Sequence, residues 1–383
     1  MILKKISFLL LPALISLYSC SETSTSSEDT DADPNGEETL LLEFGSDETS
    51  GKVKVMSRNI YIGTDVGSLL GEVSLVQIPS AARNAFYQLE NTKFIERAEV
   101  LSEEIEKTQP HLIGLQEVAH VFIQSPGDFL SGNGQRANIE IYDYLQILMD
   151  ALSAKSLDYT IAAVLNNADI ELPMLPTDYS EPNSQLDDVR LIDRDVILIR
   201  NDVSFSNVAT IRYTDSLVVD TSFGISVPRG YTALTAEIDG NSYRFANTHL
   251  EAFDFTQTLR TGQLEQLLSD MANETIPVIL VGDFNFTPVN FLYPSLTQDG
   301  YEDAWVNNTL TYNTEGYTFG HDNDLQNSRV DFSSRIDYIF VKPSNAFTFE
   351  ESFVVGDELR DRTPSDLWPS DHGGVISKIN FNN

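Results

Sequence analysis

Residues 278–285 read Val-Ile-Leu-Val-Gly-Asp-Phe-Asn, four apolar residues followed by a glycine and two separated polar side chains. The apolar run, Val278 to Val281, predicts a fully buried strand. If the backbone stays extended, Asp283 and Asn285 point the same way, into whatever lies at the end of the sheet. A polar turn is the alternative interpretation, but this motif is the most specific one in the chain.

Polar residues also stand at or next to the ends of other predicted strands. We expect these strands near residues 52–60, 111–118, 243–250, 335–342 and 375–381. Taken singly, each has an ordinary explanation as a turn residue, an edge salt bridge or a structural histidine. Together they supply the carboxylate, amide and imidazole groups that phosphate-ester hydrolysis with a hard cation requires. The residues are Asn59, Glu117, His249, Asp337, Asp371 and His372.

Helical patterns and turn signals separate the strands. Apolar residues recur at helical spacing in residues 94–105, 141–152 and 264–271. Asp239-Gly240 between two apolar stretches favours a β-hairpin, whereas the polar, Pro-containing stretch Asn166 to Asp193 predicts a surface loop. Many short strands with a few helices between them predict a layered α/β protein, in which two packed sheets are flanked by helices.

The first twenty residues form a separate segment. Lys4 and Lys5 precede an apolar run that is too short to span a bilayer, which indicates an export signal. Cys20, the only cysteine, stands where a bacterial lipoprotein signal places the acylated residue. We therefore expect residues 1–20 to be a lipoprotein signal and the protein to be exported and membrane-anchored, in the periplasm or on the cell surface. An ordinary cleaved signal and an uncleaved anchor are the alternatives.

Charge divides the remaining chain. The sequence holds 58 acidic and 24 basic residues, for a formal net charge of −34. Residues 21–51 are acidic, rich in Ser and Thr and poor in apolar residues, which predicts a disordered tether. No later linker divides the chain, so we expect one domain over residues 52–383, acting as a monomer. Its acidity disfavours binding to long nucleic acid, although bound cations can screen such a substrate.

The motifs, in their order, resemble those of the endonuclease/exonuclease/phosphatase (DNase I-like) superfamily. They are Asn59, Glu117, Asn-Thr-His at 247–249, Gly-Asp-Phe-Asn at 282–285, Arg-Ile-Asp-Tyr at 335–338 and Ser-Asp-His at 370–372. The resemblance spans residues 52–382. It implies a four-layer α/β-sandwich of two mixed sheets and a metal-dependent phosphoric ester hydrolase.

The resemblance also implies which residues bind the metal and the substrate. Glu117, helped by Asn59 and by Asp371, would bind Mg²⁺ or Mn²⁺. Asn59 would also contact the substrate. Arg194 resembles a family position that reaches the scissile phosphate, although a solvated residue at a strand entrance is the simpler interpretation.

Catalytic roles carried over from the resemblance fall on five residues. Asp283 and Asn285 would position the attacking water and the phosphate. His372, oriented by Asp337, would contact the phosphate or act as the base. His249 would stabilise the phosphorane or protonate the leaving group. The resemblance does not decide whether Asp283 or His372 removes the proton.

Two insertions depart from the family pattern, whereas two helix residues agree with it. Insertions at Tyr61–Asn91 and His120–Glu140 are expected to shape the substrate pocket, because loops at this end of the fold carry the site. Arg260 and Gln263 resemble residues that support the His249 loop.

The favoured function is an exported phosphodiesterase acting on a lipid head group, a small phosphodiester or extracellular nucleic acid. The alternatives are a nuclease for extracellular DNA or RNA and a non-catalytic binding module.

Overall fold

The computed structural model describes residues 51–67, 76–132, 134–176, 185–220, 225–254, 257–308, 315–343 and 347–381. The predicted signal peptide with Cys20, and the predicted tether up to residue 50, lie outside these residues. The fold below is that of the unit Leu40–Asn383, within its described residues. In the described part of the chain, no helix has the length and apolarity needed to cross a membrane.

Sheet A is the larger of the two main sheets and has eight strands. The strands β1 and β2 are parallel, and the other pairs are antiparallel. In order across the sheet they are β15 (Phe347–Val355), β16 (Gly374–Phe381), β1 (Lys52–Asn59), β2 (Leu112–Gln116), β6 (Asp187–Arg200), β3 (His120–Gln124) and β4 (Ile139–Asp143), with β5 (Tyr159–Met174) also paired to β6.

Sheet B has six strands and one parallel pair, β11 with β12. Its order is β13 (Glu302–Asp303), β14 (Asp337–Lys342), β12 (Val278–Asp283), β11 (Asn241–His249), β10 (Gly230–Ile238) and β7 (Ser204–Arg212). A small third sheet pairs β8 (Leu217–Asp220) with β9 (Ile225–Val227).

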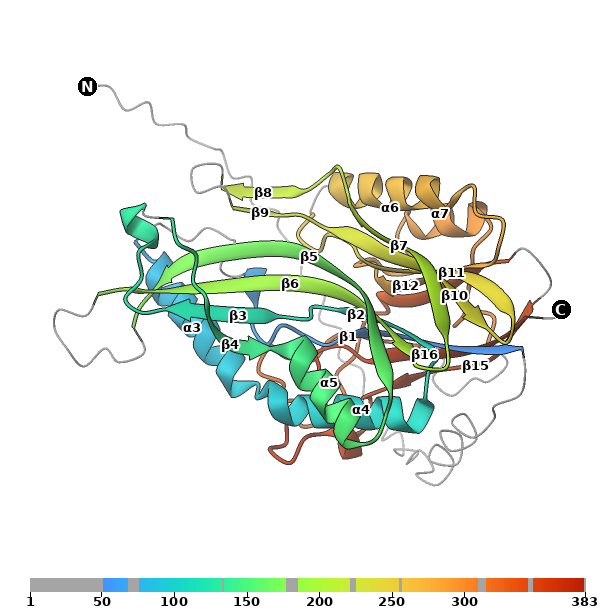
Figure 1. Ribbon diagram of the computed structural model, residues 1–383, viewed down its shortest axis with the longest axis horizontal. Helices are drawn as coiled ribbons and strands as arrows, with labels where there is room; N and C mark the ends of the chain where they lie inside the picture. Colours follow the sequence, from blue (N-terminus) through green and yellow to red (C-terminus); the bar gives the residue numbers. More distant parts are fainter. Residues whose placement is uncertain are drawn as a thin grey trace, which may run out of the picture. The chain divides into compact units, whose positions relative to one another are not determined.

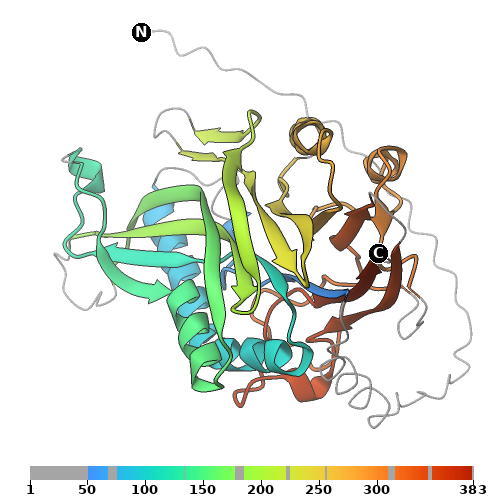
Figure 2. The same ribbon diagram turned by 45° about the vertical axis from the view of Figure 1, so that its right-hand side comes forward.

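Helices cover the outer faces of both main sheets (Figures 1 and 2). On sheet A lie α3 (Ile78–Asn91), α4 (Phe94–Thr108) and α5 (Tyr144–Ala154), and their apolar residues share one core cluster with that sheet. On sheet B lie α6 (Thr258–Met271) and α7 (Tyr293–Gln298), which share another cluster with it. Short 3-10 helices occupy Phe129–Ser131 and Leu359–Asp361.

Alternating side chains on the central strands create the separate cores. In β6, Val196 and Leu198 face the helices, whereas Ile197 and Ile199 lie in the core between the sheets. Successive side chains of a strand point to opposite faces, so a strand apolar at every position must be covered on both sides. The order helix, sheet, sheet, helix confirms the predicted four-layer α/β-sandwich.

The predicted hairpin and helices are confirmed. The strands β10 and β11 pair up to Ile238 and Asn241, and the two residues between them have positive φ, 51° at Asp239 and 80° at Gly240. Positive φ at both central positions is the tight turn that Asp-Gly favours. The three helical patterns form α4, α5 and α6.

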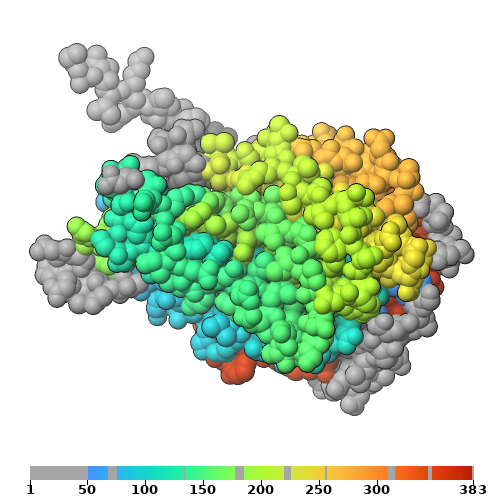
Figure 3. All heavy atoms as spheres, in the orientation of Figure 1, coloured from blue at the N-terminus to red at the C-terminus, as the bar shows by residue number. Residues whose placement is uncertain are grey.

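The surface loop predicted for Asn166–Asp193 is wrong. Much of this stretch belongs to β5 and β6, which pair along their length. These strands are among the green segments that cover most of the visible face in Figure 3. Its polar residues are compatible with a strand because some are exposed, as Asn166 is, and others pair across the hairpin. Arg190 donates to Asp169 at 2.7 Å.

Candidate active site

Three of the predicted site residues lie side by side at one end of sheet B. The register pairs His249 at the end of β11 with Asp283 at the end of β12, and Asp283 with Asp337 at the start of β14. Gly282 makes this arrangement possible, because its φ is +153° and a Cβ there would collide with the backbone of Thr248.

The corresponding end of sheet A carries the other predicted residues. The parallel strands β1 and β2 end at Asn59 and Gln116, with Glu117 next, and β16 starts just after His372. Asn59 Nδ2 donates to Asp283 Oδ2 at 3.2 Å, which joins the two sheets at the site.

A cavity of about 240 Å³ lies where these two ends meet. Its lining contains more acidic than basic groups, and its cations are Arg229 and His372. The carboxylates are Asp65, Glu117, Asp193, Asp283 and Asp371. An anionic substrate would be repelled by this surplus of negative charge unless a cation offset it.

Asp283 is 1% exposed and lies among the other site residues. Burial and the charge of Asp337 raise its pKa to about 7, although His372 opposes the shift. The backbone does not stay extended beyond it as the sequence predicted, because Asn285 has a φ of 52° and its N–H donates to Asp283 Oδ1 at 2.9 Å. Asn285 still lines the cavity, and its side chain donates to the Leu250 carbonyl.

His372 is held by a buried acid. Its Nδ1 lies 2.8 Å from Asp337 Oδ2, which also accepts from Thr318 Oγ1 at 2.6 Å. Burial alone would lower the pKa of His372, but the charges of Asp337 and Asp371 raise it to about 10. The ring is therefore an imidazolium, with Nε2 directed to Asp283 Oδ2 at 3.7 Å.

His249 is held in the opposite state. Burial and the charge of Arg229 keep its pKa well below the ordinary value. Arg229 lies 3.1 Å from Nδ1, and a guanidinium can only donate, so Nδ1 is the acceptor and Nε2 carries the hydrogen. This N–H lies 3.5 Å from Asp283 Oδ2.

Glu117 and Asp371 line the cavity from sheet A. Glu117 has a φ of 59°, and its Oε2 accepts from the Ile62 N–H at 2.9 Å. Burial raises the pKa of Asp371 to about 7, with His372 opposing and Glu117 adding to the shift. Two adjacent carboxylates of this kind fit a divalent cation, because such a cation would offset both their desolvation and their repulsion.

Two other groups of His and acidic residues have metal-like spacing in the described part of the chain. One is Asp283, Asp337 and His372, in which His372 is hydrogen-bonded to Asp337 and lies 3.7 Å from Asp283. The other is His120, Glu140 and Asp143, outside the cavity, where Asp143 is paired with Arg194. Glu117 with Asp371 remains the better cation site, because neither carboxylate is paired with a basic side chain there.

Two predicted residues have other partners. Asn59 was expected to bind metal and substrate, but it lies behind Asp283, outside the cavity lining, and its Oδ1 accepts from the Tyr61 N–H. Arg194 was expected to reach the phosphate. Its guanidinium instead donates to the carbonyls of Val118 and Ala119 and to Asp143, because it lies on the part of β6 next to β3.

Arg229 is the cavity residue that the sequence interpretation missed. It is 6% exposed and donates to Asp193 at 2.8 Å, and its buried Nε lies 3.9 Å from Glu251 Oε2. It stands in Val-Pro-Arg-Gly at 227–230, just before β10. An arginine between Pro and Gly at the entrance of an apolar strand was the available signal.

The roles predicted for the first insertion and for α6 have a structural counterpart, whereas the pocket-shaping role predicted for the second insertion has none among the described residues. Tyr61, Ile62, Thr64, Asp65 and Val66 of the first insertion line the cavity. None of the described residues of the second insertion, 120–140, lines it. Arg260 and Gln263 bond to the backbone of Glu251, two residues after His249.

Comparisons with known proteins agree with this geometry. The sequence profile described as "Endonuclease/Exonuclease/phosphatase family" matches residues 91–372. No curated protein matches the sequence. Three solved structures are similar in fold, each with 18% identity and each matched over 100% of its own chain.

The first of these structures is a humanized TDP2 of D. rerio with 14 mutations (TM-score 0.52, 86% of this chain covered). The second is an endonuclease/exonuclease/phosphatase family protein of Bacteroides thetaiotaomicron (0.52, 88%). The third is a mannosyl-6-phosphatase of the same species (0.50, 86%). At this identity they show the fold alone, while the profile covers most of the sequence. The chain belongs to the endonuclease/exonuclease/phosphatase family.

Proposed function

We propose that the protein is an exported, metal-dependent phosphodiesterase. The observation that carries the proposal is the convergence of His249, Asp283, His372 and Arg229 on one carboxylate-rich cavity. Family members are phosphoesterases or nucleases, which supports hydrolysis as the reaction class.

Three donors are available to the oxygens of a bound phosphate. They are the imidazolium of His372, the guanidinium of Arg229, which lines the cavity, and the Nε2–H of neutral His249. Buried donors fixed before the substrate arrives stabilise developing charge without reorganisation. We assign them to the non-bridging oxygens of the phosphate.

Asp283 is the best candidate for the general base. Its pKa of about 7 lies near the pH at which such an enzyme works, so the carboxylate can accept a proton from the attacking water. His372 is a poor base, because its pKa is raised to about 10 and it is already protonated. This assignment chooses between the two candidates that the sequence left open.

His249 fits the role of phosphorane stabiliser better than that of acid. Its lowered pKa keeps the ring neutral, so it has a donor N–H but no labile imidazolium proton for a leaving group. Arg229 fixes this tautomer by donating to Nδ1.

Glu117 and Asp371 would hold the divalent cation, Mg²⁺ or Mn²⁺. When bound, the cation would neutralise charge on the phosphate and polarise its P–O bonds. The Glu117 carboxylate accepts a hydrogen bond from the Ile62 N–H, and the Asp371 carboxylate accepts one from the Ser370 hydroxyl at 3.4 Å.

Export and lipid anchoring at Cys20 also belong to the proposal. The support is the basic and apolar start of the chain and its single cysteine. Labelling cells with an alkynyl fatty acid should tag the wild-type protein and fail to tag Cys20→Ser. Equal labelling of both forms would show that Cys20 is not acylated.

Hydrolysis of bis-p-nitrophenyl phosphate by the purified protein tests the reaction. We expect activity with Mg²⁺ or Mn²⁺, loss of activity with EDTA, and a loss of at least about 10²-fold in Asp283→Asn and His249→Ala. Plasmid DNA and RNA offered in the same assay distinguish a nuclease from an enzyme for smaller diesters.

Matched variants outside the cavity control for folding. His120→Ala removes an imidazole on β3, and Asp299→Asn removes a carboxylate after α7, so both should retain activity. If wild-type protein with metal hydrolyses no phosphoric ester, the proposal is wrong and a non-catalytic binding module becomes the better interpretation.

A further inference from the structure

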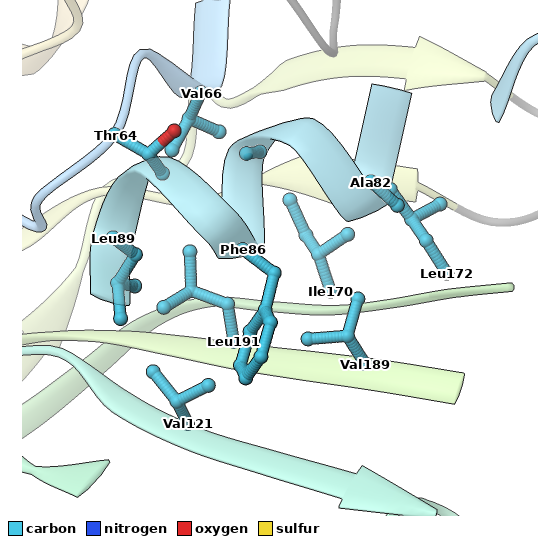
Figure 4. A pocket seen from close by; sticks show the side chains of 11 residues that line it. Thr64, Val66, Ala82, Phe86, Leu89, Val121, Ile170, Leu172, Val189 and Leu191 are labelled. Atoms are coloured by element: carbon cyan, nitrogen blue, oxygen red, sulfur yellow. The ribbon is translucent and has the colours of Figure 1, made fainter. Parts of the chain in front are cut away.

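A second, apolar cavity of about 60 Å³ lies beside the catalytic cavity. It is enclosed between α3 and the strands β3, β5 and β6 (Figure 4). Phe86 and Leu89 enter it from the helix, and Val189 and Leu191 face them from β6. Apart from the hydroxyl of Thr64, which is bonded to Gln88 Oε1 at 3.1 Å, its lining side chains are apolar.

Strand register sets the floor of this apolar cavity. Leu191 is paired with Val121 on one side and with Ile170 on the other, and Val189 is paired with Leu172. Side chains directly opposite in neighbouring strands lie on the same face of a sheet. The floor is therefore a continuous apolar surface two strand spacings wide.

The apolar cavity borders the catalytic cavity. Thr64, Val66, Ile170 and Leu191 line both. Along β6, Leu191 is followed two residues later by Asp193, which lines the catalytic cavity and binds Arg229. Residues two apart in a strand are separated by about 7 Å. A short chain attached to a phosphate near Arg229 can therefore extend from one cavity into the other.

The chemistry of the lining restricts what this chain can be. Sugar or nucleoside hydroxyls would lose their water there without gaining partners, which is unfavourable. An alkyl group would instead exchange water for close contacts with Phe86 and Val189.

We propose that the apolar cavity binds the alkyl part of the substrate, so that the substrate class is an amphiphilic phosphodiester. This inference rests on the proposed phosphodiesterase function. It adds that specificity comes from α3, part of the 61–91 insertion, and from the β5–β6 hairpin. Attack of water on phosphorus forms one P–O bond and breaks the bond to the leaving alcohol, while the alkyl group stays on the phosphate.

A series of alkyl p-nitrophenyl phosphodiesters, from methyl to octyl and each below its micelle concentration, tests this. Water releases p-nitrophenolate, and the alkyl phosphate remains as the second product. We expect kcat/KM to rise by about threefold for each methylene that enters the apolar cavity, before reaching a plateau.

Ala85→Phe fills the apolar cavity from α3 without changing the catalytic lining. It should abolish the dependence on chain length and leave hydrolysis of the methyl ester unchanged. Asn84→Phe adds the same ring to the exposed side of α3 and should keep the wild-type dependence. If Ala85→Phe does not fold, Ala85→Leu should reduce the dependence.

The possible results separate the two claims. Equal kcat/KM for methyl and octyl esters in wild-type protein contradicts the alkyl site and leaves the phosphodiesterase intact. An unchanged dependence in folded Ala85→Phe also contradicts it. Failure to hydrolyse any ester contradicts the phosphodiesterase function and, with it, this inference.

Discussion

The guanidinium of Arg229 links two parts of the site. It pairs with Asp193 and fixes the tautomer of His249. Both bonds involve Nη1, so a planar guanidinium keeps its other nitrogen donors, which a single ammonium nitrogen does not have. Arg229 thus orients the ring of His249, and in the proposed function it also binds the phosphate.

Arg229→Lys should reduce kcat/KM on a chromogenic diester by about 10²-fold, the usual effect of losing one preorganised donor. Arg194→Lys is the matched control, because Arg194 is buried but lies outside the cavity lining. It should change kcat/KM by less than about threefold. If folded Arg194→Lys loses as much activity as Arg229→Lys, the phosphate-binding role predicted for Arg194 would be right.

The difference between these two arginines shows where sequence interpretation stops. Asp283, His249 and His372 could be predicted, because each belongs to an ordered motif at the end of an apolar strand. Which arginine reaches the phosphate depends instead on how β10 and β6 are placed in two different sheets. No spacing within the chain encodes that distance, and the same holds for Asn59, whose amide is used by Asp283.

At the scale of elements, α4 ties the loops of the site together. Arg97, fully buried on this helix, donates to the carbonyls of Thr92, Ile60, Tyr61 and Pro369 at 2.7 to 3.1 Å. The carbonyls of Ile60 and Tyr61 immediately precede Ile62, whose N–H donates to Glu117. The carbonyl of Pro369 lies in the segment that leads to His372. The alignment of these segments therefore depends on one side chain outside the cavity lining.

Arg97→Met should lower the free energy of unfolding by about 3 kcal/mol, because it leaves several buried carbonyls without a donor. Lys107→Met, on the exposed side of the same helix, should change it by less than about 0.5 kcal/mol. Urea unfolding followed by circular dichroism measures both. Equal stability of the two variants would mean that the carbonyls find other donors.

Elements with strong local patterns were predictable, and elements defined by pairing were not. The apolar stripes of α4, α5 and α6 and the Asp239-Gly240 turn appear in the sequence directly. The long β5–β6 hairpin does not, because residues such as Asp169 are stabilised in a strand by partners distant in the sequence, Arg190 on the neighbouring strand and Arg136. Such cross-strand pairs contribute to sheet stability but leave no periodic signal.

At the scale of the whole molecule, the net charge of −34 makes further ionisation unfavourable in buried acidic regions. Asp357 lies in one such region, near Glu104 and Asp361, and its Oδ1 is buried without a partner among the described residues. Burial and the charge of Asp361 raise the pKa of Asp357 from 3.8 to about 7.

A raised pKa means that the folded protein keeps this proton while the unfolded chain loses it. The contribution of Asp357 to the free energy of unfolding is fully present below pH 4 and is lost as the pH rises through about 7. Asp357→Asn should remove the loss, so that its unfolding free energy exceeds that of wild type by about 2 kcal/mol at pH 8. The free-energy difference that corresponds to the whole change in pKa is about 4 kcal/mol, and partial exposure of the side chain reduces it.

Urea unfolding of both proteins at pH 4, 6 and 8 measures the difference. The curves should coincide at pH 4 and separate as the pH rises. A constant difference at all three values would assign the effect to packing and not to ionisation.

Gly114 of β2 faces Val281 and Asn247 so closely that a Cβ there would overlap both side chains. Glu117 and Asp371, the carboxylates that we propose to bind the metal, lie with His372 at the end of one sheet, and Asp283, His249 and Arg229 lie at the end of the other. The thickness of the interior between the sheets therefore sets the span across which water, cation and phosphate must align. A substitution deep inside the sandwich, even one that leaves every polar group in place, can slow turnover by widening that span.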